Sequence, residues 1–195
     1  MIKADNWIIY KRTDYDKVKD IVDYDKIYII DTLSATVAVK IMADYALKLI
    51  EENKTAPEIA EIMEAMKSKL RITATVDTLK YLWLGGRVSR TTAVVADAVS
   101  IKPGIIVNPE GAVQVTNKYL GVSRAIKDLV KQMKNADVDR NFPLYLIYSY
   151  KPENSMKLKK ALETADIPVD EVYGLGATLG VHVGPGAFGV IYIAK

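Results

Sequence analysis

Apolar residues recur at helical spacing in three long segments of the chain. The spacing predicts helices over residues 35–52 and 122–134, each with one apolar face. A further helix is expected from Thr55 to about residue 70, because Thr55 and Glu58 form a capping box, with Pro57 in the first turn. These segments predict amphipathic helices that cover a sheet.

Three shorter segments also favour helix. Asp77 is positioned to cap a short helix that runs to Trp83 and ends at a glycine pair. Residues 91–100 are small and apolar, and Asn154 is expected to cap a helix that runs to Ala165.

Runs rich in β-branched and aromatic residues lie between these helices and predict strands. The predicted strands are 6–10, 26–31, 71–76, 104–108, 112–116, 142–150, 169–173 and 187–194. Pro109-Glu110-Gly111 provides turn chemistry for a hairpin between two of them. Alternating strands and helices indicate an α/β fold, and the hairpin indicates a mixed sheet.

The first part of the chain holds only one or two strand–helix units. Such a region cannot form a sheet with both faces covered, so it is expected to lie beside another structure.

The composition restricts the classes of function. The 195 residues include 27 basic and 24 acidic residues, a net charge of +3, which is too balanced to favour nucleic acid or an anionic membrane as main partner. The absence of cysteine excludes disulfides, thiolate metal sites and cysteine nucleophiles. Neither a signal peptide nor an apolar run of membrane-spanning length is recognisable, so a cytoplasmic bacterial protein is the default expectation.

His182, the single histidine, lies in the glycine-rich run from Gly180 to Gly186. Glycine lets backbone approach a ligand closely, and a histidine there can donate a hydrogen bond to a carboxylate or phosphate. The alternative is a surface loop with an incidental histidine, which is the commoner meaning of such a run.

Other chemistry finds little support in the sequence. The glycines at 174, 176 and 180 do not have the spacing of a dinucleotide fingerprint. We find no phosphate-binding loop, zinc-ligand spacing or nucleophile elbow, and no nucleophile–base pair. The sequence therefore predicts no catalytic residues, no metal and no cofactor.

The segment after residue 84 contains two arginines beside the flexible pair Gly85-Gly86. Arg87 and Arg90 suit phosphate or carboxylate, although a solvated turn is the commoner outcome. The small side chains of residues 91–100 allow either close packing, which is commoner, or room for an apolar guest.

Three segments together resemble the DegV family of fatty-acid-binding proteins. They are Val76 to Leu82 followed by Gly85-Gly86-Arg87-Val88-Ser89, then Ile101-Lys102-Pro103 before the hairpin, and Gly180 to Gly189 around His182. Their order and spacing match the family from about Tyr28 onward. By this resemblance, residues 56–195 are a DegV-like carboxy-terminal domain and residues 1–55 a remnant of the amino-terminal domain.

The resemblance implies two α/β domains with a long apolar tunnel that holds one long-chain fatty acid. His182 would then hydrogen-bond the carboxyl group, and the adjoining turn and tunnel wall would come from Gly184, Pro185, Gly186, Thr91, Val94, Val95 and Ala98. Some members present the fatty acid to a separate acyl kinase, and Arg87 and Arg124 would meet that partner.

The chain also departs from the family pattern. The opening Asp-Ser/Thr motif, the Thr-Thr-Ser-Gln segment and the Ser-Gly-Thr loop are missing, and Val122 stands where a basic residue is expected. The alternative function is therefore a truncated DegV-like interaction module, completed by self-association or by a partner. An incomplete domain should expose a sheet edge or apolar surface.

Overall fold

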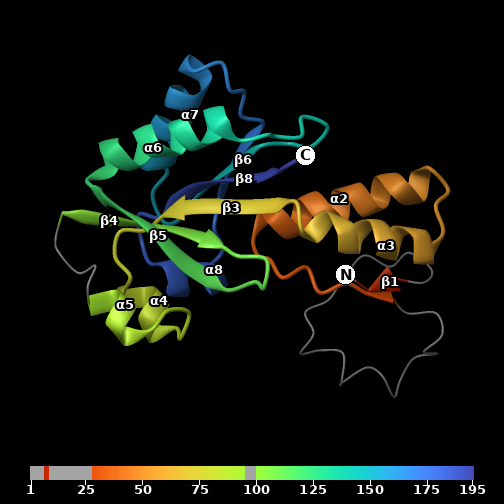
Figure 1. Cartoon of the computed structure of the whole chain (residues 1–195), viewed down its shortest axis with the longest axis horizontal. Helices are drawn as coiled ribbons and strands as arrows, with labels where there is room; N and C mark the ends of the chain where they lie inside the picture. Colours follow the sequence, from red (N-terminus) through yellow and green to blue (C-terminus); the bar gives the residue numbers. More distant parts are fainter. Residues whose placement is uncertain (1–6, 9–27, 95–99) are drawn as a thin grey trace.

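The computed structural model describes residues 7–8, 28–94 and 100–195. Its centre is a six-stranded mixed sheet in the order β5-β4-β3-β8-β6-β7 (Figure 1). Only β6 and β7 run parallel; the other neighbours are antiparallel. The strands are β3 (Leu70–Thr75), β4 (Ile101–Val107), β5 (Val113–Leu120), β6 (Tyr145–Tyr148), β7 (Glu171–Gly174) and β8 (Phe188–Ile193). The predicted α/β class and mixed sheet are confirmed.

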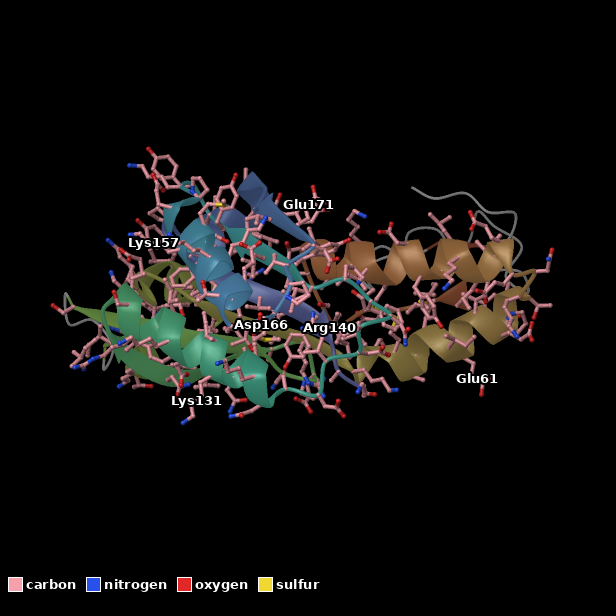
Figure 2. The ribbon with its side chains drawn as sticks, turned by 90° about the horizontal axis from the view of Figure 1, so that it is seen from above. Glu61, Lys131, Arg140, Lys157, Asp166 and Glu171 are labelled. Atoms are coloured by element: carbon pink, nitrogen blue, oxygen red, sulfur yellow. The ribbon has the colours of Figure 1, made fainter. Side chains whose placement is uncertain are left out.

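Two long helices cover one face of the sheet. Helix α6 (Val122–Asn135) packs beside α7 (Glu153–Thr164), and their leucines meet alternate residues of β6 and β8. The shared core contains Leu129, Leu144, Leu146, Leu158, Leu162, Phe188 and Val190. Figure 2, seen from above this layer, labels exposed Lys131 and Lys157 on these two helices. The predicted helix at residue 154 therefore exists, but it begins at Glu153 with Pro152 as N-cap, so Asn154 is not the cap.

The opposite face carries α2 (Val37–Glu51) and α3 (Ala56–Lys67) over one end. Their apolar residues pack on Leu70, Ile72, Tyr145, Ile147, Ile191 and Ile193, the residues of the sheet that alternate with those under α6 and α7. The predicted capping box is present, since the Thr55 amide donates to the Glu58 carboxylate at 2.7 Å. That bond lowers the pKa of Glu58.

Three short helices lie over the other part of this face. Helices α4 (Lys80–Leu84) and α5 (Arg90–Val94) follow β3, and α8 (Ala177–Val183) follows β7. Figure 1 shows α4 and α5 away from the α2–α3 pair. The predicted helix over residues 91–100 is thus observed from Arg90 to Val94, and residues 95–99 lie outside the described part.

A second, two-stranded sheet lies apart from the main one. Strand β1 (Trp7–Ile8) pairs in parallel with β2 (Tyr28–Ile29), next to α3. The proposed division of the chain at residue 55 stays a prediction. Ile30, which follows β2, nevertheless packs in the same buried cluster as α2, α3 and the main sheet.

Candidate functional site

His182 lies in a helix and not in the glycine-rich loop that the sequence suggested. It occupies the last turn of α8, which ends at Gly184 with a positive φ of 73°. The Gly184 amide donates to the Gly180 carbonyl at 2.8 Å, which continues the helical hydrogen bonding to the end. The run Gly180–Gly186 is therefore a helix terminus followed by a short turn, and this corrects the loop interpretation.

The His182 ring is half-buried against α4. A methyl group on Gly85, the C-cap of α4, would lie 3.1 Å from Cε1 of His182 and would overlap Nδ1. Among the described residues, the imidazole has no hydrogen-bond partner. A neutral imidazole can donate one hydrogen bond and accept another, and because the Nδ1–Cε1 edge faces Gly85, Nε2 is the nitrogen on the open edge of the ring. The ring is thus available to a polar group of a ligand.

An apolar cluster lies under α4 and α8. Its buried members are Ala74, Val76, Leu79, Leu82, Ile105 and Ala187, and Val88, Val113, Val115 and Val183 pack against it. The His182 ring contacts Gly85 at the end of α4, and α4 contributes Leu82 to the cluster, so the imidazole lies beside the helix that covers it. The cluster draws on β3, on the β4–β5 hairpin and on both helices.

Ser149 fixes the turn that follows His182. Its buried hydroxyl donates to the Gly184 carbonyl at 2.5 Å and accepts from the Ala187 amide at 2.9 Å. Two backbone hydrogen bonds complete the attachment. The Ser149 amide donates to the Ala187 carbonyl, and the Gly186 amide donates to the Ser149 carbonyl. The end of β6 therefore positions residues 184–187. Sequence analysis did not identify Ser149.

Asp77 has a different role from the predicted helix cap. Helix α4 begins at Lys80 with Leu79 as N-cap, and Asp77 instead forms an ion pair with Lys102 at 2.5 Å. Lys102 and Pro103 belong to β4, and the Pro103 carbonyl accepts from the Val76 amide. A methyl group on Gly186 would lie 3.5 Å from the Asp77 carboxyl carbon, so this ion pair is close to the turn after α8.

The remaining predicted ligand residues are dispersed. Gly184 is buried, Gly186 is half-buried with φ of 81°, and Pro185 between them is exposed. Thr91 is exposed in α5, with its hydroxyl 2.9 Å from that of Ser89. Val94 is the last residue of α5, and Val95 and Ala98 lie outside the described residues.

The two arginines expected to meet a partner come from opposite faces of the sheet. Arg87 is exposed just after α4, and its guanidinium donates to the Gly85 carbonyl. Arg124 is exposed in the first turn of α6, and no carboxylate of the described residues forms an ion pair with it. Arg87 is thus connected to the His182 surroundings through Gly85, whereas Arg124 is not.

Ser34 is a further polar residue that sequence analysis missed. Its hydroxyl is buried without a hydrogen-bond partner, in the loop that leads into α2. The loop has an unusual backbone, with φ of 48° at Leu33 and 58° at Thr36. A methyl group on Gly111, in the β4–β5 turn, would lie 3.1 Å from the Leu33 carbonyl oxygen. One hairpin therefore contacts both the Ser34 loop and the cluster beside His182.

The described part of the chain contains neither a cluster of metal-ligating side chains nor a membrane-spanning helix. No group of three His, Asp or Glu side chains there could hold a metal ion. Likewise, none of the helices described is both long and apolar enough to cross a bilayer.

These features define an α/β protein with a polar site at the border of an apolar cluster, and comparison with known proteins identifies its family. The DegV family model matches residues 14–195. The DegV domain-containing protein YteA of Lactococcus lactis is 30% identical over 172 residues, 87% of this chain and 59% of that protein. A DegV domain-containing protein of Caldanaerobacter subterraneus is 28% identical over 180 residues, 91% of this chain and 64% of that protein. The chain belongs to the DegV family, and it spans less than two thirds of the length of these relatives.

Solved structures of the family share the fold. A fatty acid binding DegV family protein from Streptococcus agalactiae superposes with a TM-score of 0.81 at 23% identity, over 94% of this chain and 65% of that one. A DegV family protein from Eubacterium eligens, loaded with heptadecanoic acid, gives a TM-score of 0.79 at 20% identity, over 94% and 66% of the two chains. At this level of identity the likeness establishes the fold.

Proposed function

We propose that this chain binds a long-chain fatty acid, with the carboxylate at His182 and the acyl chain along the apolar cluster under α4 and α8. The observation that carries the proposal is the imidazole of His182, half-buried and without a partner among the described residues. A buried carboxylate is costly unless it receives hydrogen bonds, so a free donor beside apolar residues suits an acid with a long tail. The role is binding and not catalysis.

Ser34 supports the same site as a second donor. Its buried hydroxyl lacks a partner, which is unusual in a folded protein and is relieved when a ligand accepts the hydrogen bond. It also precedes α2, a helix of 15 residues whose amino-terminal dipole favours an anion. The β4–β5 hairpin, with Ile105, Val113 and Val115 in the apolar cluster, would then form a floor between the two donors.

The energy of such binding is sufficient. Each methylene group that leaves water contributes about 0.8 kcal/mol, so a sixteen-carbon chain contributes roughly 12 kcal/mol when fully buried. Loss of translational and rotational freedom costs at least about 4 kcal/mol. A partly covered acyl chain would therefore still bind, and this matters because the chain spans only part of its relatives' length.

The relatives support the choice of ligand. The Eubacterium eligens protein was solved with heptadecanoic acid, and one from Eubacterium ventriosum is a stearic acid-binding protein. Both are saturated acids with long chains. We extend this ligand class to the present chain on the strength of its family membership.

Lipid extraction and binding measurements test the proposal. Purified protein should release a long-chain fatty acid on organic extraction, identified by mass spectrometry. Calorimetric titration of delipidated protein with hexadecanoate should show binding that is at least about tenfold weaker in His182→Ala, because a carboxylate would lose a hydrogen bond worth about 1.5–3 kcal/mol. Lys157→Ala, on the opposite face, serves as control. Absence of both extracted acid and hexadecanoate binding would refute the proposal.

The family resemblance further suggests that the bound carboxylate is presented to a separate acyl kinase. Arg87 supports this role, since its guanidinium is exposed near the Gly85 turn beside His182. Arg124, on the other face, would contribute only if the partner extends around the sheet edge. Phosphoryl transfer from ATP to bound hexadecanoate, in the presence of an acyl kinase from a DegV-containing bacterium, should slow in Arg87→Ala while hexadecanoate affinity is kept.

The pair β1–β2 favours a second candidate function, an interaction module completed by self-association. Each strand has two residues, and no third strand joins them among the described residues. Isolated two-stranded sheets are marginally stable in water, so a strand from a second copy could extend this one. Light scattering after size exclusion should then show a dimer, and a monomer at all concentrations tested would argue against it.

A further inference from the structure

Helices α4 and α8 contact each other at two points, and at each point a side-chain ring from one helix lies against a glycine at the end of the other. At the first, the ring of His182 lies directly against the backbone of Gly85. At the second, the ring of Tyr81 lies against Gly184, where a methyl group would be 2.9 Å from the Tyr81 Cγ. Since real Cβ atoms essentially never approach closer than 3.0 Å to another heavy atom, neither glycine can be replaced without a shift.

The two contacts are reciprocal. Tyr81 and Gly85 are four residues apart, at the same side of α4, while His182 and Gly184 lie two residues apart at the end of α8. Each helix therefore contributes one ring and one glycine. The Gly85 backbone lies against the His182 ring, and the Tyr81 ring lies against Gly184, the residue that ends α8.

Gly85 is itself held in place. Its amide donates to the Tyr81 carbonyl at 2.9 Å, and its carbonyl accepts from the Arg87 guanidinium. The neighbouring Leu82 is buried in the apolar cluster and anchors α4 to the sheet. The surface that meets the His182 ring is thus backbone of a fixed turn.

We infer that Gly85 and Tyr81 are positioning residues for His182: Gly85 sets the plane of the imidazole, and Tyr81 sets the end of the helix that carries it. With the Nδ1–Cε1 edge of the ring facing Gly85, Nε2 is the nitrogen directed to a ligand. The inference rests on the proposed function, in which this nitrogen meets a carboxylate. Binding groups must be held within about 0.5 Å of their productive position, so a displaced ring would bind an acid poorly.

The single histidine makes the test direct, because only one imidazole contributes to the spectrum. Gly85→Ala should move the ¹H and ¹³C resonances of the His182 ring in the ligand-free protein. The control is Gly180→Ala in α8. A methyl group there would meet no atom within 4 Å beyond its chain neighbours and the backbone of its own helix, so the ring resonances should stay at their parent positions. Unchanged ring resonances in Gly85→Ala would overturn the inference.

Affinity for hexadecanoate provides the second measurement. Gly85→Ala should raise the Kd on the order of tenfold, and a 1 Å misplacement can cost more than that. In a His182→Ala background the same substitution should have no further effect, because Gly85 acts through the ring. An equal loss in both backgrounds would show that Gly85 acts independently of His182 and would overturn the inference.

Tyr81 keeps the test decisive if Gly85→Ala does not fold. Tyr81→Phe retains the ring against Gly184 and should keep the parent ring resonances and the parent Kd. Tyr81→Leu should alter both the resonances and the Kd. Equal behaviour of the two variants would overturn the inference. The two proposals fail differently. If the parent protein does not bind hexadecanoate, the proposed function fails, and the ring resonances still decide whether Gly85 and Tyr81 position His182.

Discussion

The two faces of the six-stranded sheet are covered in different ways. The α6–α7 layer uses two long helices whose leucines are fully buried, such as Leu158 and Leu162 at 0% exposure. The α4–α8 layer uses short helices that meet through glycines, and it borders polar groups without partners. The first layer is a closed apolar core, and the second is the layer in which the proposed function places the ligand.

Polar groups near α6 and polar groups near α8 and α2 can be compared by their hydrogen-bond partners. Under α6, the Tyr119 hydroxyl donates to Asp128 at 2.6 Å, and Gln132 donates to the same carboxylate at 2.7 Å. Near α8 and α2, His182 and the buried hydroxyl of Ser34 have no partner among the described residues. The hydroxyl of Thr75, opposite Phe188 on the α6–α7 side of the sheet, is likewise buried without a partner among the described residues. The two faces therefore differ in the His182 ring and the Ser34 loop, which the proposed function assigns to the ligand, and not in the presence of an unpaired hydroxyl as such.

The largest expected effect is on the α6–α7 face. Leu158→Ala should lower the free energy of unfolding by about 2–5 kcal/mol, because it leaves a cavity in a closed core. Urea unfolding measures the change, and the exposed neighbour variant Lys157→Ala should stay within about 0.5 kcal/mol of the parent. Hexadecanoate affinity of the folded Leu158→Ala protein should be kept. A loss of affinity would show that the two faces are coupled.

An intermediate effect is expected at Ser149, which joins the sheet to the turn after His182. Ser149→Ala leaves the Gly184 carbonyl and the Ala187 amide without their hydroxyl partner and should cost about 1–3 kcal/mol. It should also weaken hexadecanoate binding. Ser155→Ala is the matched control, since this buried serine makes one longer bond, 3.3 Å to the Ile147 carbonyl, under α7. Equal effects on affinity would contradict the assignment of the site.

The smallest effect concerns Tyr119 and depends on pH. Burial, followed by the hydrogen bond with Asp128, raises the pKa of Tyr119 to about 12. A raised folded-state pKa gives stability that is present below the ordinary value of 10.0 and is lost as the pH rises through about 12. Tyr119→Phe should therefore be less stable than the parent by about 1 kcal/mol at pH 8. The gap should narrow above pH 10, as urea unfolding at each pH would show.

Tyr150→Phe provides the comparison for that titration, because Tyr150 is 79% exposed. Its stability should follow that of the parent at every pH. A gap between Tyr119→Phe and the parent that stays constant up to pH 12 would contradict the raised pKa.

The sequence was most informative where local signals agree with the fold. The capping box at Thr55 and the apolar periodicity of α2, α3 and α6 predicted those helices, and the turn at Pro109–Gly111 predicted the β4–β5 hairpin. In each case the residues that decide the structure are neighbours in the chain. Tertiary contacts add to these elements but do not change them.

The sequence was misleading where distant contacts decide. Glycines at 180, 184 and 186 suggested a loop, yet Ala177–Val183 is helical and packs against α4. Asp77 resembled a cap, but its partner Lys102 is 25 residues away. The loop that carries Ser34 has positive φ angles at Leu33 and Thr36, and Leu33 contacts the hairpin turn at Gly111, features that no local pattern specifies.

Strand β8 joins two groups of strands that otherwise have no ladder between them. On one side it pairs with β3, as Leu70 does with Ile193, and on the other with β6. Leu70 and Ile193 are far apart along the chain, and this separation delays their pairing because a long loop must close first. We expect the β4–β5 hairpin to form early during refolding, and the insertion of residues 188–193 to be the late step that unites the molecule.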